Sequence, residues 1–181
     1  MPFHQIVERD GQTGRIQRTF VYDTDGIHAR IPDSHGKVQK KFIYSHDSHE
    51  ISELTGEKDD RIRRVLSFSE GTAILSEGGG YRKIRRLYQI SEDGTEIKER
   101  EGSRFGPVVR TFIFGPKGVL EKEGEEYSEK RMFVFEQGSP FIREKSGGWY
   151  GTVSRVFECE RIDPWIFMKP EAFLQFIFVV D

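Results

Sequence analysis

The feature that most constrains the fold is a segment repeated seven times, roughly every 23 residues. Each copy has a basic residue followed, at every second position, by large apolar residues, as in Arg18-Thr-Phe20-Val-Tyr22 and Arg110-Thr-Phe112-Ile-Phe114. The seven basic residues are Arg18, Lys40, Arg64, Arg86, Arg110, Arg131 and Arg155. Alternation with period two predicts β-strands, and repetition at a fixed interval predicts one structural unit used many times.

Turn-forming residues follow each copy, for example Asp23-Thr-Asp-Gly26 and Ser91-Glu-Asp-Gly94. A second apolar stretch then leads to another break, so the unit is predicted to be a β-hairpin. We predict an all-β fold in which antiparallel hairpins follow one another up and down and curl into a closed or nearly closed barrel of about 10–14 strands. Closure removes exposed strand edges. An open spiral of hairpins is the alternative.

The register of the hairpins is predicted from charge. In five consecutive copies a glutamate stands 13 residues after the base, as in Arg110 and Glu123. Opposite charges directly across an antiparallel pair attract, so we expect these residues to face each other. The first and last bases, Arg18 and Arg155, have Ile31 and Met168 at that distance and are expected to lack an acid.

The whole chain, residues 1–181, is expected to form a single barrel domain, with 160–181 as an apolar closing segment. Pro170 could begin a short helical turn, and Phe176-Ile-Phe-Val-Val180 is predicted to be a buried strand. The hairpin meander with an apolar interior resembles the calycin group, meaning lipocalins and fatty-acid-binding proteins. The Gly-x-Trp signature of lipocalins near the first strand is absent, and Trp149 lies near the end. Phe20-Val-Tyr22-Asp-Thr-Asp-Gly26 resembles one YD repeat.

Composition limits the function. The net charge of −2 gives no general attraction to nucleic acid, and no apolar run is long enough for a membrane-spanning helix. The single cysteine, Cys159, favours a reducing, cytoplasmic location, and no signal peptide is recognised. His46 and His49 flank a predicted turn without a third ligand, so we expect no metal site. No cofactor motif is present.

The leading hypothesis is a non-catalytic protein that binds a small amphipathic or anionic ligand inside the barrel. Inward arginines would grip the anion, and rings would hold the apolar part. The candidate residues are Arg18, Phe20, Tyr22, Phe42, Tyr44, Arg86, Tyr88, Arg110, Phe112, Arg131, Phe133 and Arg155. The opposing interpretation is that the arginines form internal ion pairs and the rings a packed core.

Two further functions stay open. The outer face or the C-terminal segment could make the chain an interaction or scaffold module, with a homodimer as one form. An enzyme such as a cofactor-free cyclase or isomerase, with its site at the barrel mouth, is the third hypothesis. No catalytic residue is identified, and the sequence favours a protein that is not an enzyme.

Overall fold

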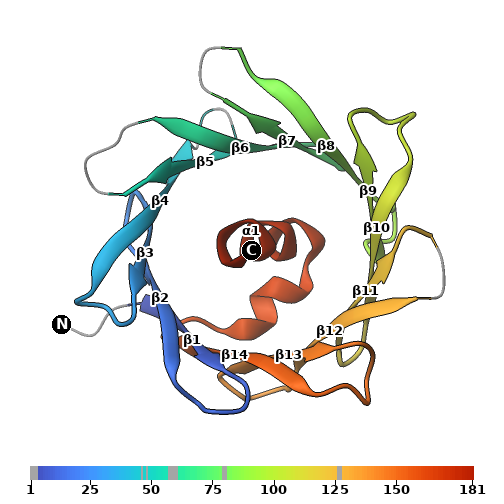
Figure 1. Ribbon diagram of the computed structural model, residues 1–181. Coiled ribbons are helices and arrows are strands. Elements are labelled where there is room, and N and C mark those ends of the chain that lie inside the picture. The colour runs from blue at the N-terminus through green and yellow to red at the C-terminus, as the bar shows by residue number, and fades with distance from the viewer. Residues whose placement is uncertain (1–3, 46, 48, 57–60, 79–80, 126–127) are drawn as a thin grey trace.

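The computed structural model describes the chain except residues 1–3, 46, 48, 57–60, 79–80 and 126–127. Fourteen antiparallel strands form a closed barrel in which sequence neighbours pair and β1 pairs with β14 (Figure 1). The strands are β1 (His4–Asp10), β2 (Ile16–Tyr22), β3 (Gly26–Ile31), β4 (Lys37–Ser45), β5 (Glu50–Thr55), β6 (Ile62–Ser69), β7 (Thr72–Glu77), β8 (Lys83–Ile90), β9 (Glu96–Glu101), β10 (Val108–Gly115), β11 (Gly118–Glu123), β12 (Glu129–Phe135), β13 (Phe141–Ser146) and β14 (Val153–Glu160). The predicted up-and-down barrel is confirmed.

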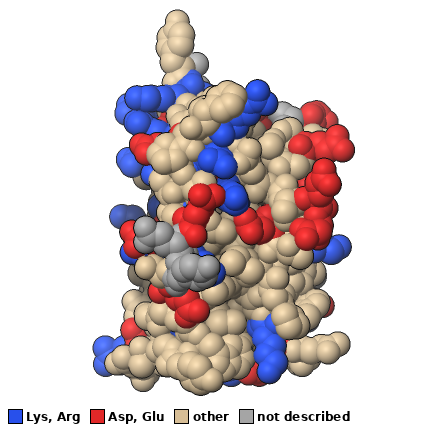
Figure 2. Space-filling view, turned by 90° about the vertical axis from the view of Figure 1, so that its right-hand side faces the viewer, with Lys and Arg blue, Asp and Glu red and all other residues tan. Residues whose placement is uncertain are grey.

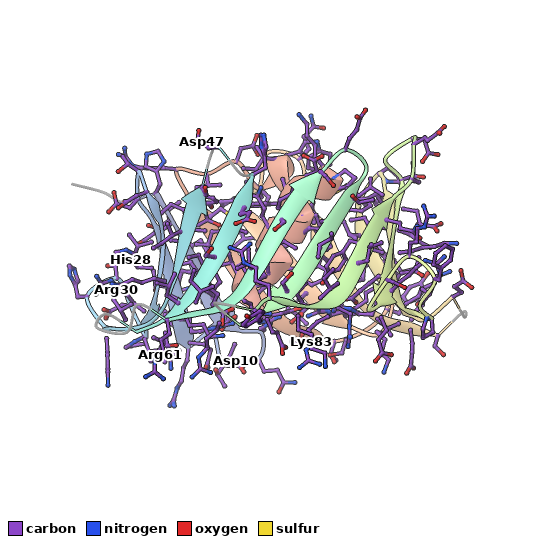
Figure 3. All side chains as sticks on the ribbon, turned by 90° about the horizontal axis from the view of Figure 1, so that it is seen from above. Asp10, His28, Arg30, Asp47, Arg61 and Lys83 are labelled. Carbon is purple, nitrogen blue, oxygen red and sulfur yellow. The ribbon has the colours of Figure 1, made fainter. Side chains whose placement is uncertain are left out.

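The two rims of the barrel differ. The connections after β2, β4, β6, β8, β10 and β12 have two to five residues and lie at one rim. Those after β1, β3, β5, β7, β9, β11 and β13 have five or six residues and lie at the other, which we call the long-loop rim. Figure 3 shows the long-loop rim along its lower edge, marked by Asp10, Arg61 and Lys83, and Asp47 at the opposite rim. Side chains alternate along each strand, so one set faces the interior of the barrel.

A helix occupies the centre of the barrel (Figure 1). After β14 the chain forms a 3₁₀-helix, η1 (Pro164–Met168), and then the helix α1 (Pro170–Val180). The prediction of a strand over 176–180 is therefore wrong. Pro170 stands in the first turn, where its missing N–H costs nothing, and the helix continues for eleven residues. A helix that is apolar on nearly all sides is stable only when it is buried.

The core forms where α1 meets the inward rings of the barrel wall. Phe173 is fully buried, and its ring lies 5.3 Å from those of Phe112 and Phe114 and 5.5 Å from that of Phe133, all edge-on. Phe178 packs edge-on against Phe42 at 5.6 Å. Edge-to-face pairs contribute about 0.5–1.5 kcal/mol each beyond the burial of apolar area. The helix thus supplies the core that fourteen strands alone would leave hollow.

The strand register differs from the prediction in three of the five hairpins. Arg64 does lie opposite Glu77, and Arg110 opposite Glu123, as expected. Lys40, Arg86 and Arg131 instead face Thr55, Glu101 and Ser146, because the strands pair two residues further along. Five of the bases also lie directly opposite an acid on the preceding strand, 10 or 11 residues earlier in the sequence. Those pairs are Glu8–Arg18, Glu53–Arg64, Glu99–Arg110, Glu121–Arg131 and Glu144–Arg155.

A β-bulge accompanies every base. The register shifts between the base and the strand before it in all seven cases, which leaves one extra residue immediately before the base. The extra residues are Gln17, Gln39, Arg63, Arg85, Val109, Lys130 and Ser154. Bulges at a barrel rim bend the strand and redirect the next side chain. Here the redirected side chain is the base.

Among the described residues, no helix has both the length and the apolar character needed to cross a membrane.

Candidate functional site: the charged belt and the cavity beside Arg86

A belt of charged side chains runs around the inside of the barrel near the long-loop rim. Seven bases on the even-numbered strands face seven positions on the odd-numbered strands before them. Five of those positions hold glutamate, and two hold Ala29 and Leu75, opposite Lys40 and Arg86. The five glutamates are 3–5% exposed. A buried carboxylate is stable only with charged or hydrogen-bonding partners, and the bases provide them.

Each belt glutamate joins two bases. Glu8 accepts hydrogen bonds from Arg18 at 2.7 Å and from Arg155 at 2.9 Å. Glu121 lies 2.8 Å from Arg110 and 2.5 Å from Arg131. Four of the arginines also stack on the ring two residues further on. In one of them, Arg131, the guanidinium carbon lies 4.9 Å from the centroid of the Phe133 ring. In these four copies the repeated pattern of a base and an aromatic residue two positions later forms this stack.

Burial and the neighbouring charges act on the titration of the belt in opposite directions. Burial disfavours the charged form of Arg110, but its hydrogen bonds with Glu99 and the charges of Glu99 and Glu121 outweigh burial and raise its pKa. Burial also acts to raise the pKa of Glu144, but Arg155 and Arg131 outweigh it and lower that pKa. Arg110 and Glu144 are therefore both ionised at neutral pH.

The belt also caps the C-terminal end of α1. Arg18 and Arg155 donate to the carbonyl oxygen of Val180 at 2.5 and 3.2 Å, and Arg64 donates to that of Phe178 at 3.3 Å. Arg155 also donates to the carboxylate of Asp181 at 3.0 Å. The last carbonyls of a helix lack intrahelical partners and carry the negative end of its dipole. The cations of the belt satisfy them and so hold the helix on the barrel axis.

The belt is interrupted where Ala29 and Leu75 replace glutamate. Among the described residues, the base after each interruption is paired with one distant carboxylate: Lys40 lies 3.7 Å from Glu53, and Arg86 lies 3.8 Å from Glu99. Both side chains are 35% exposed, whereas the other five bases of the belt are 17–28% exposed. Lys40 and Arg86 are therefore the most weakly paired bases of the belt.

The ion pair of Arg86 with Glu99 is weak for a further reason, which is that two other side chains donate to the same carboxylate. Glu99 already receives hydrogen bonds from Arg110 and, at 2.8 Å, from the hydroxyl of Tyr88. Arg86 instead uses one guanidinium nitrogen to donate to the backbone carbonyl of Arg85 at 3.0 Å. Burial is the main cause that raises the pKa of Tyr88, and it keeps the hydroxyl protonated as a donor. Within the described part of the chain, the Arg86 guanidinium forms no other hydrogen bond.

A cavity of about 440 Å³ opens beside Arg86 at the Leu75 interruption. Its apolar wall is formed by Leu66 and Leu75 of the barrel and by Leu174, Ile177 and Phe178 of α1. Its polar lining consists of Arg64, Glu77, Arg85, Arg86, Tyr88, Glu99, Glu101, Arg110 and Asp181. The combination of an apolar wall and an arginine is suited to an amphipathic ligand.

Most charges of this lining are already paired. Arg85 pairs with Glu77 at 2.8 Å, and Asp181 is held by Arg131 and Arg155. Glu101 faces Arg86 in the strand register, but it is exposed and forms no ion pair with Arg86 among the described residues. The cavity therefore presents one weakly paired cation, Arg86.

Three of the twelve predicted site residues meet here: Arg86, Tyr88 and Arg110. The predicted rings Phe20, Phe42, Phe112 and Phe133 are fully buried in the core. Arg131 lies elsewhere in the belt, in ion pairs with Glu121, Glu144 and Asp181.

The prediction that Arg18 and Arg155 lack an acid is wrong. Arg18 pairs with Glu8, and Arg155 pairs with Glu8, Glu144 and Asp181. The acids were overlooked because they precede the bases in sequence, and because closure of the barrel brings β1 beside β14.

Tyr44 and Tyr22 lie partly buried against the core, away from the belt. Tyr44 lines a separate cavity of about 410 Å³ together with Glu171 and Gln175 of α1, and burial raises its pKa to about 12. His46 lies outside the described residues. Among the residues that are described, no three His, Cys, Asp or Glu side chains are grouped as a metal site would require.

Sequence reasoning missed the apolar residues that make the cavity. Leu75 is informative once the belt is known, because a glutamate stands 10 or 11 residues before five of the seven bases, and Leu75 occupies that place before Arg86. No comparable signal marks Leu174 or Ile177, because their placement depends on α1 entering the barrel.

No protein-family model matches the sequence, and no curated protein matches it. Among solved structures, the chain is similar to the X-ray structure of a protein from Arabidopsis thaliana, with a TM-score of 0.48 and 10% sequence identity over 97% of this chain and 88% of that one. A likeness of this size carries no argument about function.

Proposed function

We propose that the protein is a non-catalytic binding protein that holds a small amphipathic anion in the cavity beside Arg86. The observation that carries this proposal is the interruption of the belt at Leu75, which leaves Arg86 without an acid opposite it on the preceding strand, β7. An arginine offers a planar fork of donors that fits a carboxylate, sulfonate or phosphate group. The ligand would supply the charge that glutamate supplies elsewhere in the belt.

The apolar part of the ligand would lie against the end of α1. Ile177 and Phe178 are 4–5% exposed and form one wall with Leu174. A cavity of about 440 Å³ falls within the range typical of small-molecule sites, about 300–1,000 Å³. A short or medium-length apolar chain with an anionic head satisfies both the size and the lining.

Binding of two probes tests the proposal: 8-anilinonaphthalene-1-sulfonate, followed by its fluorescence, and decanoate, followed by displacement of that dye. We expect saturable binding that weakens at least about tenfold in Arg86→Gln, because a hydrogen bond to a charged group contributes about 1.5–3 kcal/mol. Leu75→Glu should weaken binding as much, because it places the missing acid opposite Arg86. Leu75→Gln keeps the size without the charge and should bind closer to the wild type.

The matched control is Ala29→Glu, which adds the same acid at the other interruption of the belt, opposite Lys40. It should leave probe binding unchanged. Glu101→Gln should strengthen binding, since the ligand would no longer compete with a carboxylate across from Arg86. Wild-type affinity in both Arg86→Gln and Leu75→Glu would overturn the proposal.

The two other hypotheses rest on different features. The enzyme hypothesis needs a buried acid, tyrosine or histidine that is free to react. In this cavity the hydroxyl of Tyr88 donates a hydrogen bond to Glu99. An interaction module is supported by a separate cleft on the outer face. We also propose a reducing, cytoplasmic location, which is supported by the free and buried Cys159.

A further inference from the structure

A second cleft lies on the outer face of the barrel, over β10–β12 and beside the loop that follows β13. It has a volume of about 410 Å³ and an almost wholly apolar lining. The strand register places Ile113, Leu120 and Met132 side by side across three strands, and Trp149 completes the wall. We call this the Trp149 cleft. Figure 2 looks onto this side of the barrel, and the lower half of the view, toward β11–β13, is mostly uncharged.

The loop after β13 is fixed by its own backbone hydrogen bonds, so Trp149 is held in position before any other protein binds. The N–H of Gly151 donates to the carbonyl oxygen of Gly148 at 3.0 Å, and the N–H of Gly147 donates to that of Lys130 at 2.8 Å. A Cβ atom at Gly151 would come within 1.7 Å of the carbonyl oxygen of Ser146, so only glycine permits this turn. Trp149 is nevertheless 39% exposed. Tryptophan is one of the residue types enriched among the hot spots at the centres of binding interfaces.

Two ammonium groups flank the ring of Trp149. The Nζ atoms of Lys117 and Lys145 lie 5.3 and 5.0 Å from its centroid. Lys145 also donates to the backbone carbonyl of Trp149 at 2.8 Å. Neither lysine forms an ion pair with a carboxylate among the described residues. An apolar cleft between two unneutralised cations is complementary to an apolar group with acids on either side.

We propose that the Trp149 cleft is a docking site for an acidic segment of a partner protein. One bulky apolar side chain of the segment would enter between Met132 and Trp149, and flanking carboxylates would pair with Lys117 and Lys145. The site is independent of the anion cavity, which lies inside the barrel at the belt, so either proposal can fail without the other.

Fluorescence of Trp149 tests this proposal directly. The chain has two tryptophans, so Trp165→Phe leaves Trp149 as the sole reporter. The probe is a terminally blocked hexapeptide, Glu-Glu-Leu-Phe-Glu-Glu. One control peptide replaces its glutamates with lysine, and a second replaces Leu-Phe with Ser-Ser. We expect a saturable shift of emission to shorter wavelength with the probe, and at least tenfold weaker binding of both controls.

Variants of the protein distinguish a specific effect of Lys117 and Lys145 from an effect of the overall charge. Lys117→Gln and Lys145→Gln should each weaken binding of the probe about fivefold, which corresponds to about 1 kcal/mol. Lys83→Gln removes an exposed lysine at the long-loop rim and should have no effect. Equal binding of the lysine peptide, no response to either lysine substitution, or no saturable shift would each overturn the proposal.

Sedimentation of the wild type tests whether the segment comes from a second copy of this chain. We expect a monomer in the absence of peptide. A concentration-dependent dimer that Lys145→Gln abolishes would overturn the proposal of a separate partner.

Discussion

Truncation of Phe173 tests whether α1 is the core of the barrel. Phe173 is fully buried, and its ring is in contact distance of those of Phe112, Phe114 and Phe133 at 5.3–5.5 Å. Replacement of a buried phenylalanine by alanine costs about 3–5 kcal/mol, and the loss of three edge-on ring pairs places this site in the upper part of that range. We expect Phe173→Ala to lower the free energy of unfolding by about 4–5 kcal/mol.

The assay is urea unfolding followed by far-ultraviolet circular dichroism, with thermal unfolding alongside. For a chain of this size the melting temperature should fall by about 8–20 °C, at about 2–4 °C per kcal/mol. The control is Phe105→Ala, the same truncation at a ring that is 83% exposed, with an expected change within about 0.5 kcal/mol. A loss below about 1 kcal/mol at Phe173 would refute the placement of α1 inside the barrel.

Three further results are expected. A double-mutant cycle of Arg110→Ala with Glu121→Ala should show a coupling of about 1–2 kcal/mol. The cycle of Arg110→Ala with Glu123→Ala should be additive, because Glu123 is exposed and pairs with Lys130. The pKa of Glu144 is lowered from its ordinary value of 4.5, so its ionised form stabilises the fold at pH values above 4.5. The urea midpoint should therefore fall as the pH drops below 4.5, and it should fall less in Glu144→Gln. Burial raises the pKa of Cys159 to about 12, so this thiol should not react with Ellman's reagent at pH 8 until the protein is unfolded.

The strand order and the inner face of the barrel were predictable, because they depend on local patterns. A base and a ring at alternate positions, followed by turn residues, specify a hairpin, and repetition specifies the meander. The register was harder, because the bulge before each base adds a residue that the alternation does not reveal. Ile84 illustrates this: the simple count places it inward, but beyond the bulge at Arg85 it is 46% exposed.

The helix was missed for a physical reason. Residues 170–180 include Phe173, Leu174, Phe176 and Val179, which face different sides, so no helical period is visible. Such a segment is helical because it is enclosed on all sides, and the enclosure exists only when the barrel has formed. The candidate site shares this limit: Arg86 and Tyr88 were predicted from their own strand, but the cavity between them and α1 depends on tertiary structure.

The most direct test of a ligand site at the belt interruption is a nuclear magnetic resonance titration of the arginine side chains with decanoate. The Nε–Hε signal of Arg86 is identified by its loss in Arg86→Gln. The account predicts a saturable shift of that signal on addition of decanoate, no such shift in Leu75→Glu, and little change at Arg131, which is fully paired. An unmoved Arg86 signal, or equal shifts at Arg86 and Arg131, would contradict it.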